Sequence, residues 1–205
     1  MLTQLEELPN YNCSYCPRLA EYRNKLRLQN PSWHNGPVSS FGDINSELLI
    51  VGLAPGKNGA NRTGRPFTGD GAGDFLYPSL VSHGFAAGTY STNAEDNLKL
   101  INCRITNAVR CLPPQNKPVG EEIKNCRNFL ISEIYSMPKL KIILALGRIA
   151  HCSIVKGLGQ KQATFSFTHN TFHQVSDITL VNSYHCSRYN INTKRLTKNM
   201  FDIVL

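Results

Sequence analysis

Four cysteines in two pairs have the spacing of a metal site. Cys13 and Cys16 form a C-x-x-C pair, and Cys111 and Cys126 are separated by 14 residues in the middle of the chain. C-x-x-C is a common spacing of metal ligands, and this pair together with the second, more widely spaced pair would make a four-thiolate site. Because this spacing does not separate zinc from a [4Fe–4S] cluster, both metals stay open on the residues alone.

A glycine-rich loop at residues 52–59 could hold an anion. It reads Gly-Leu-Ala-Pro-Gly-Lys-Asn-Gly, and its glycine spacing excludes both a dinucleotide-binding turn and a P-loop. What remains is a turn whose backbone N–H groups, near a helix start, can hold an anion or a developing negative charge. The alternative is a tight strand-to-helix turn without chemistry.

The next segment, residues 62–74, combines basic, aromatic and acidic side chains among glycines. Arg62 and Arg65 could meet phosphates, and Phe67 could stack on a base. Asp70 is either a functional carboxylate or the cap of the following helix, and Asp74 is a second candidate four residues on.

A histidine follows an apolar run near the carboxyl end of the chain. His185 comes directly after residues 178–184, where a side chain at a strand end is placed for chemistry. Cys186 beside it suggests a thiol protease, but adjacent residues of an extended segment point in opposite directions and do not form a nucleophile–base pair.

These residues need a scaffold, and the apolar pattern predicts one. Short apolar runs predict strands at 48–51, 142–146 and 178–181, with a weaker candidate at 100–107. Helical patterns cover 17–28, 73–82, 120–136 and 148–156. Strands that alternate with helices indicate an α/β fold with a mainly parallel sheet, in which the ligand crevice lies beyond the carboxyl ends of the strands.

Composition fits a folded protein with either a nucleic-acid partner or a basic surface that has no such role. The 205 residues suit one domain, and the 22 basic against 14 acidic residues give a net charge of +8, which a phosphate backbone would attract. The sequence lacks a signal-peptide pattern and any apolar stretch of membrane-spanning length, so we expect an intracellular protein without membrane partners. The odd number of cysteines, 7, also argues against full disulfide pairing.

Several of these segments together resemble the uracil-DNA glycosylase superfamily, most closely family 5, the iron–sulfur type B enzymes of bacteria and archaea. Residues 52–56 resemble its first motif, and residues 59–65 and 67–70 the continuation. Residues 106–114 resemble the block with a base-reading Asn and a cluster Cys, and His185-x-Ser187 resembles the last motif. The similarity extends over nearly the whole chain.

The resemblance implies a single domain over 1–205, a three-layer α/β/α sandwich with a central, mainly parallel, four-stranded sheet. It also implies a structural [4Fe–4S] cluster that ties the amino-terminal segment, residues 1–46, to the domain. The ligands that it implies for this cluster are Cys13, Cys16, Cys111 and Cys126.

The resemblance further implies a DNA repair reaction. The enzyme would flip uracil, and other deaminated bases such as hypoxanthine, out of DNA and hydrolyse the N-glycosidic bond, leaving an abasic site. The resemblance also implies a cytoplasmic protein that acts at the nucleoid of a prokaryotic cell. We expect a monomer that acts on double- and single-stranded DNA. The alternative is a non-catalytic iron–sulfur module that binds nucleic acid or senses redox state.

Roles for individual residues follow from the charges of this reaction. His185 is expected to donate to a carbonyl oxygen of the leaving base, and Asp70 to stabilise the cationic sugar and orient water. The expected base-binding residues are Gly52, Leu53, Ala54, Phe67 and Asn107, the last of which can both donate and accept. The expected DNA-contact residues are Arg62, Arg65, Arg188, Lys194 and Arg195.

Two positions depart from the family's pattern. Cys186 stands where relatives often carry Pro, which affects the last loop. Leu53 stands where sister families place a polar side chain, which moves the water-activating role to another residue.

Overall fold

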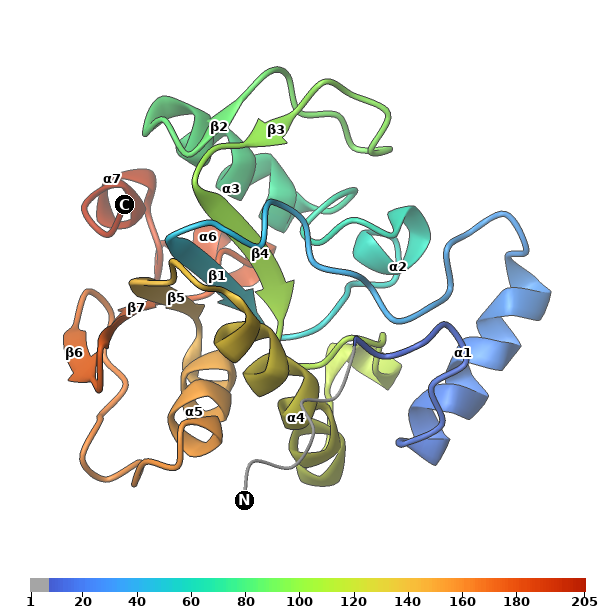
Figure 1. The fold of residues 1–205 in the computed structure, drawn as a ribbon. Helices are drawn as coiled ribbons and strands as arrows, with labels where there is room; N and C mark the ends of the chain where they lie inside the picture. Colours follow the sequence, from blue (N-terminus) through green and yellow to red (C-terminus); the bar gives the residue numbers. More distant parts are fainter. Residues whose placement is uncertain (1–7) are drawn as a thin grey trace.

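A five-stranded sheet forms the centre of the protein in the computed structural model, which describes residues 8–205 (Figure 1). Its order is β4-β1-β5-β7-β6, with β4 (Cys103–Asn107), β1 (Leu48–Gly52), β5 (Ile142–Leu146), β7 (Ile178–Ser183) and β6 (Phe172–Val175). The first four strands pair in parallel, and β6 pairs antiparallel to β7 at the edge. The predicted α/β fold is confirmed, but the predicted number of four strands is wrong because β6 adds a fifth.

Alternate residues of the strands pack on opposite faces of the sheet. On one face, Leu48 and Ile50 of β1 pack with α3 (Gly71–Ser82) and α7 (Lys198–Asp202). On the other face, Leu49 and Val51 pack with α4 (Gly120–Ser136) and α5 (Arg148–Gly157). Figure 1 shows helices on both faces, as expected for parallel strands that are apolar on both sides.

The predicted long helices are present, with small shifts at their ends. The structure has α1 (Pro17–Gln29), and α4 has the predicted bounds, whereas α3 begins two residues earlier than predicted, at Gly71. Several short elements were not predicted. They are α2 (Ala60–Thr63), η1 (Pro114–Asn116), α6 (Arg188–Asn192), α7 and the small ribbon of β2 (Ala86–Ala87) and β3 (Lys99–Leu100).

The amino-terminal segment packs on the domain through α1 and the irregular chain that follows it. Phe41 forms an isolated antiparallel bridge to Ile105 of β4. Asn61 of α2 donates its side-chain amide to Asn35 Oδ1 at 2.9 Å, and both residues are buried. Residues 1–7 of the predicted segment 1–46 lie outside the described residues. Within the described part of the chain, every helix is too short or too polar to span a bilayer.

Candidate active site

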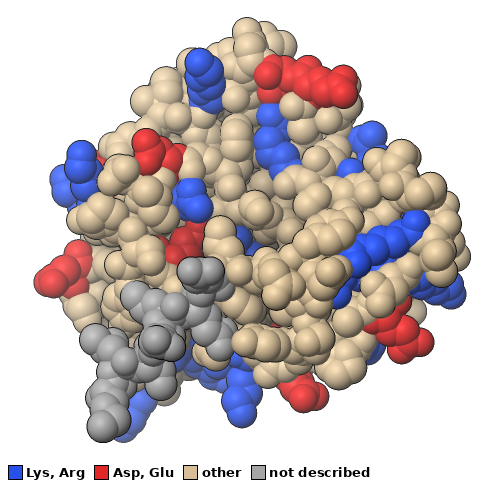
Figure 2. Space-filling view, turned by 45° about the vertical axis from the view of Figure 1, so that its right-hand side comes forward, with Lys and Arg blue, Asp and Glu red and all other residues tan. Residues whose placement is uncertain are grey.

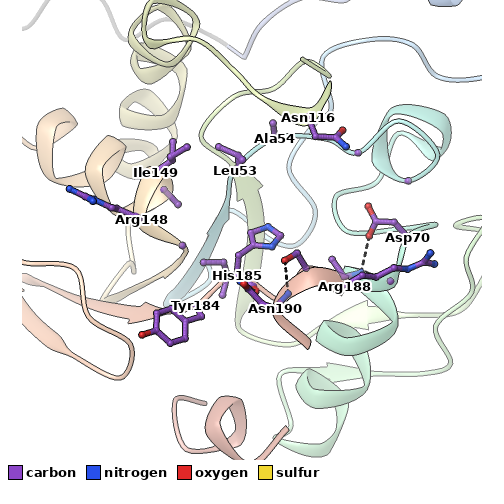
Figure 3. Close-up of a pocket in the computed structure, with 18 of the residues that line it drawn as sticks. Leu53, Ala54, Asp70, Asn116, Arg148, Ile149, Tyr184, His185, Arg188 and Asn190 are labelled. Atoms are coloured by element: carbon purple, nitrogen blue, oxygen red, sulfur yellow. Dashed lines mark hydrogen bonds between the residues drawn. The ribbon is translucent and has the colours of Figure 1, made fainter. Parts of the chain in front are cut away.

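An open cavity of about 870 Å³, here called the active-site cavity, lies at the carboxyl ends of the parallel strands. The loops after β1, β5 and β7 and the start of α3 line it, which is where the topology of a parallel sheet places a ligand crevice. Figure 3 shows His185 near the middle of this cavity, with Asp70 and Arg188 on one side and Leu53 and Ile149 on another.

His185 is held by the loop that follows β7. Asn190 donates its side-chain amide to the His185 carbonyl at 2.8 Å and fixes the backbone of this loop. Burial lowers the pKa of His185, and the nearby negative charge of Asp70 opposes that shift in part. His185 is therefore a neutral imidazole at neutral pH, with one N–H available to donate.

Asp70 both caps a helix and lines the active-site cavity. Its Oδ1 accepts hydrogen bonds from the backbone N–H groups of Ala72 at 3.1 Å and Gly73 at 3.4 Å, so it is the N-cap of α3. Its Oδ2 faces the glycine-rich turn, where a Cβ on Gly59 would lie 2.4 Å from it. Asp74 is exposed in the first turn of α3. The two interpretations of Asp70 are thus compatible, since each uses a different oxygen.

The predicted base-binding residues divide into two groups. Leu53 and Ala54 line the active-site cavity. Gly52, Phe67 and Asn107 lie together beneath it, because a Cβ on Gly52 would lie 2.4 Å from Asn107 Oδ1 and 2.5 Å from Phe67 Cζ. Phe67 and Asn107 are both buried, and the Phe67 ring stacks against His185. His185 therefore lies between the Phe67 ring, which it covers, and the open cavity, which it lines.

Basic side chains surround the active-site cavity. Of the predicted DNA contacts, Arg188 and Arg195 line it, and Lys194 is exposed in the same loop. Arg188 lies over the start of α3, because a Cβ on Gly71 would lie 2.4 Å from its Nε. The Arg195 guanidinium lies 4.9 Å from the centroid of the Tyr184 ring. On the face of the molecule that Figure 2 shows, basic and acidic side chains are interspersed.

Arg62 and Arg65, the other two predicted DNA contacts, bind parts of the protein itself. Arg62 donates to the backbone carbonyls of Asn58 at 2.9 Å and Thr92 at 3.1 Å. Arg65 forms a bidentate ion pair with Asp96 at 2.7 and 2.6 Å, and its side chain is only 11% exposed. We therefore assign both arginines to holding the loop of residues 88–97 against the site and leave them out of the proposed DNA surface.

Several residues of the active-site cavity were missed by the sequence analysis. Lys57, in the loop after β1, and Arg148, the first residue of α5 after the end of β5, add to its basic rim. Both lie beyond the carboxyl ends of strands, where the sequence predicted a ligand crevice. Phe167 lies in a long irregular loop. His151 holds that loop, because its ring nitrogens contact Asn182 Oδ1 and the Phe165 carbonyl, each at 2.8 Å. Nothing in the local sequence indicates these long-range contacts.

The four cysteines expected to bind a metal line one small cavity between α1, α4 and the loop after β4. Cys111 and Cys126 are buried there, and Cys13 and Cys16 pack against them. Within residues 8–205, however, no group of three or more His, Cys, Asp or Glu side chains is arranged to hold a metal ion. Thiolates are ligands of both zinc ions and iron–sulfur clusters, so the residues that line this cavity are chemically suited to either group.

The surroundings of these thiols suit a negatively charged group. The backbone N–H of Arg110 donates to Cys126 Sγ at 3.3 Å, and Asn125 Nδ2 donates to Cys16 Sγ at 3.8 Å. Arg23 and Arg110 also line the cavity, and the buried Nε of each is without a hydrogen-bond partner among the described residues. Donors directed at sulfur and unsatisfied buried guanidinium nitrogens fit thiolates that carry charge.

Comparisons with known proteins agree with this geometry. The profile of a family described as the uracil DNA glycosylase superfamily matches residues 39–205. A type-5 uracil-DNA glycosylase of Thermus thermophilus is 40% identical over 200 residues, covering 94% of this chain and 90% of the relative. One of Pyrobaculum aerophilum is 37% identical over 190 residues, covering 91% and 83%. A type-4 uracil-DNA glycosylase of the latter organism is 32% identical over 161 residues, covering 78% and 67%.

Proposed function

This chain belongs to the uracil-DNA glycosylase superfamily, and we propose that it is a hydrolase that removes uracil from DNA by cleaving the N-glycosidic bond. The observation that carries the proposal is the placement of His185 and Asp70 on one open cavity at the carboxyl ends of the strands. A neutral donor and a carboxylate at one cavity match the two charges that develop when a base leaves a sugar.

His185 acts on the leaving base. Cleavage moves the electron pair of the C–N bond onto the base, so negative charge grows on its carbonyl oxygens. A neutral imidazole donates a hydrogen bond to such an oxygen without first giving up a proton, and the pKa lowered by burial keeps His185 in this form. One such preorganised donor typically contributes 10²–10³-fold in rate.

Asp70 acts on the sugar. Departure of the base leaves positive character on the sugar, which a carboxylate stabilises electrostatically, and the same group orients a water for attack on that carbon. The two backbone N–H groups that bind Oδ1 fix the carboxylate and leave Oδ2 for this role. Leu53, an apolar residue at the cavity, has no group for activating water.

Phe67 and Asn107 bind the flipped base. Extrusion of a nucleotide from the duplex costs a few kcal/mol, and stacking on Phe67 offsets part of this. The Asn107 amide carries both a donor and an acceptor for the edge of uracil. Gly52 is required below them, because any side chain there would meet the Asn107 amide and the Phe67 ring.

The range of substrates extends beyond uracil in duplex DNA. We propose that hypoxanthine and other deaminated bases are also removed, since hypoxanthine, like uracil, presents a carbonyl oxygen and a ring N–H that the Asn107 amide can bind. We also propose that the protein acts as a monomer and on both double- and single-stranded DNA.

The four cysteines hold a [4Fe–4S] cluster in this proposal. Cys13 and Cys16 precede or cap α1, while Cys111 and Cys126 belong to the domain core. When bound, the cluster would supply structural cross-linking between these two parts. The donors around the sulfurs and the shared cavity support this assignment.

Base excision is tested with purified protein and synthetic DNA. Duplexes and single strands carrying uracil or hypoxanthine are incubated with the protein and then treated with alkali, which cleaves at abasic sites. Alkali-labile cleavage at the uracil position is expected, and binding without cleavage would identify the non-catalytic alternative.

The cofactor is tested by metal content. Anaerobically purified protein should be brown and carry about four irons per chain, as a Cys₄-held [4Fe–4S] centre does. Cys13→Ala should destabilise the fold more than Cys152→Ser, because Cys152 lies on α5, away from the four-cysteine cavity. A colourless protein with one zinc would overturn the cluster assignment.

A further inference from the structure

We propose that Arg23 is the counter-cation of the four-cysteine site, and that its charge retains the iron–sulfur group bound there. This inference rests on the cofactor assigned above. It gives a specific function to a buried charge that the excision mechanism does not use.

Arg23 is placed at this site by α1. With Leu19 and Leu26 it forms the buried face of that helix, and it is 5% exposed. Its Nη2 donates to the carbonyl oxygen of Cys13 at 2.8 Å, and its Nη1 donates to Cys111 Sγ at 3.7 Å. One guanidinium therefore spans the amino-terminal pair of cysteines and the core pair.

Arg23 lacks the carboxylate partner that Arg65, Arg104 and Arg110 have. Arg65 pairs with Asp96 at 2.6 Å, and Arg104 and Arg110 pair with Glu133 at 2.6 and 2.5 Å. Among the described residues, no acidic side chain forms an ion pair with Arg23, and its buried Nε is without a hydrogen-bond partner. Burial of an unpaired guanidinium is strongly unfavourable.

A thiolate-bound group would compensate this charge. Neutral thiols offer Arg23 only a weak sulfur acceptor, whereas four thiolates around a cluster carry net negative charge. The arginine and the cluster then stabilise each other, because each supplies the charge that the other lacks. Removal of the cation should weaken retention of iron and make the cluster harder to reduce, since reduction adds a further negative charge.

The test compares Arg23→Lys with Arg23→Gln in full-length protein purified anaerobically. Lys keeps the charge and Gln keeps a hydrogen-bond donor without the charge, so their comparison separates charge from packing. Arg27→Gln is the matched control, because Arg27 lies one turn further along α1 and donates to the oxygens of Tyr11, Asn12 and Asn35. Iron and sulfide per chain, bleaching of the visible absorbance by a chelator, and the reduction midpoint potential are measured.

We expect Arg23→Gln to lose iron to the chelator roughly tenfold faster than wild type. This factor corresponds to the lower end of the free energies typical of a hydrogen bond to a charged group. Arg23→Lys should lie close to wild type, Arg27→Gln should match it, and the midpoint potential should fall in Arg23→Gln. Equal iron loss in the Gln and Lys variants, or an unchanged potential, would overturn the counter-cation role. Wild-type protein without iron would overturn it together with the cofactor, whereas excision activity, measured separately on uracil DNA, tests the proposed reaction.

Discussion

Phe67 and His185 lie ring against ring, with 5.8 Å between their centroids and 27° between their planes. Because Phe67 is only 6% exposed, a base can stack on the ring face that His185 covers only after the imidazole has moved off that face. The N–H of an imidazole lies in the plane of its ring, so it reaches a carbonyl oxygen from the edge of the base and not from a position stacked on it. Entry of the base thus moves His185 to the edge of the group whose departure it assists.

Replacement of His185 by Ala should slow excision of uracil by about two orders of magnitude in single-turnover assays, because the developing charge on the base loses its donor. Affinity for uracil-containing duplex should change little, since stacking and phosphate contacts survive. His83→Gln, at the exposed carboxyl end of α3, is the control. The defect should shrink for a base that already leaves easily, and an equal defect for every base would remove the leaving-group role.

Asp70→Asn should also lower the excision rate by about two orders of magnitude, since the amide keeps an oxygen for capping α3 but loses the charge that stabilises the sugar. Unlike the defect of His185→Ala, this defect should be the same for easily and poorly leaving bases. Asp74→Asn is the matched control, because Asp74 is exposed in the first turn of the same helix. If Asp74→Asn excised uracil slowly and Asp70→Asn excised it at the wild-type rate, Asp74 and not Asp70 would be the carboxylate that acts on the sugar.

The parts of the fold that could be predicted are those with a local signal. The helix α4 was predicted with its observed bounds because apolar residues recur at helical spacing along its buried side. The strand β6 was missed because its burial pattern is mostly exposed, with Phe172 at 59% exposure, and only pairing with β7 makes it a strand. Edge strands depend on such tertiary pairing more than on local pattern.

The residues of the site also divide into those that the local sequence could predict and those that it could not. His185 and the glycine-rich turn could be predicted because strand ends in a parallel sheet converge on one crevice. The roles of Arg62 and Arg65 could not, since only the tertiary structure brings the loop of residues 88–97 and its Asp96 to these arginines. A basic residue beside a predicted site is equally consistent with a phosphate contact and with a buried ion pair until its neighbours are known.

Gly52→Ala should impair excision while leaving the fold intact. The added Cβ would lie 2.4 Å from Asn107 Oδ1 and 2.5 Å from the Phe67 ring, so both base-binding side chains must shift. We expect a loss of at least tenfold in kcat/KM on uracil DNA, with far-ultraviolet circular dichroism unchanged. Gly120→Ala is the control, because a Cβ at the start of α4 meets nothing within 4 Å. Wild-type kinetics in Gly52→Ala would place base recognition elsewhere.

DNA affinity should depend steeply on salt, and the residues at the active-site cavity should set part of that dependence. Arg188→Gln and Arg195→Gln should each reduce the slope of log K against log salt by about 1, the contribution of one phosphate contact. Lys194→Gln tests the remaining predicted phosphate contact, which lies beside Arg195 in the loop after α6. Arg65→Met should leave the slope unchanged, because Arg65 is paired with Asp96. An affinity that does not respond to salt would eliminate the electrostatic contribution altogether.

The ion pair of Asp96 with Arg65 should make stability depend on acid in a defined range. Hydrogen bonds from Arg65 lower the pKa of Asp96 from 3.8 to about 2, so the folded protein binds fewer protons than the unfolded chain between these values. The pair therefore contributes about 2 kcal/mol to the free energy of unfolding. This contribution is fully present well above pH 4 and is lost as the pH falls toward 2.

Asp96→Asn should reduce the free energy of unfolding by about 3 kcal/mol at pH 7, because it leaves the Arg65 guanidinium buried without its partner. Urea unfolding at pH 7 and at pH 3 should show the gap to wild type narrowing in acid, with Glu95→Gln in the same loop showing no such change. A gap independent of pH would mean that Asp96 supports the loop through shape and backbone hydrogen bonds instead of charge.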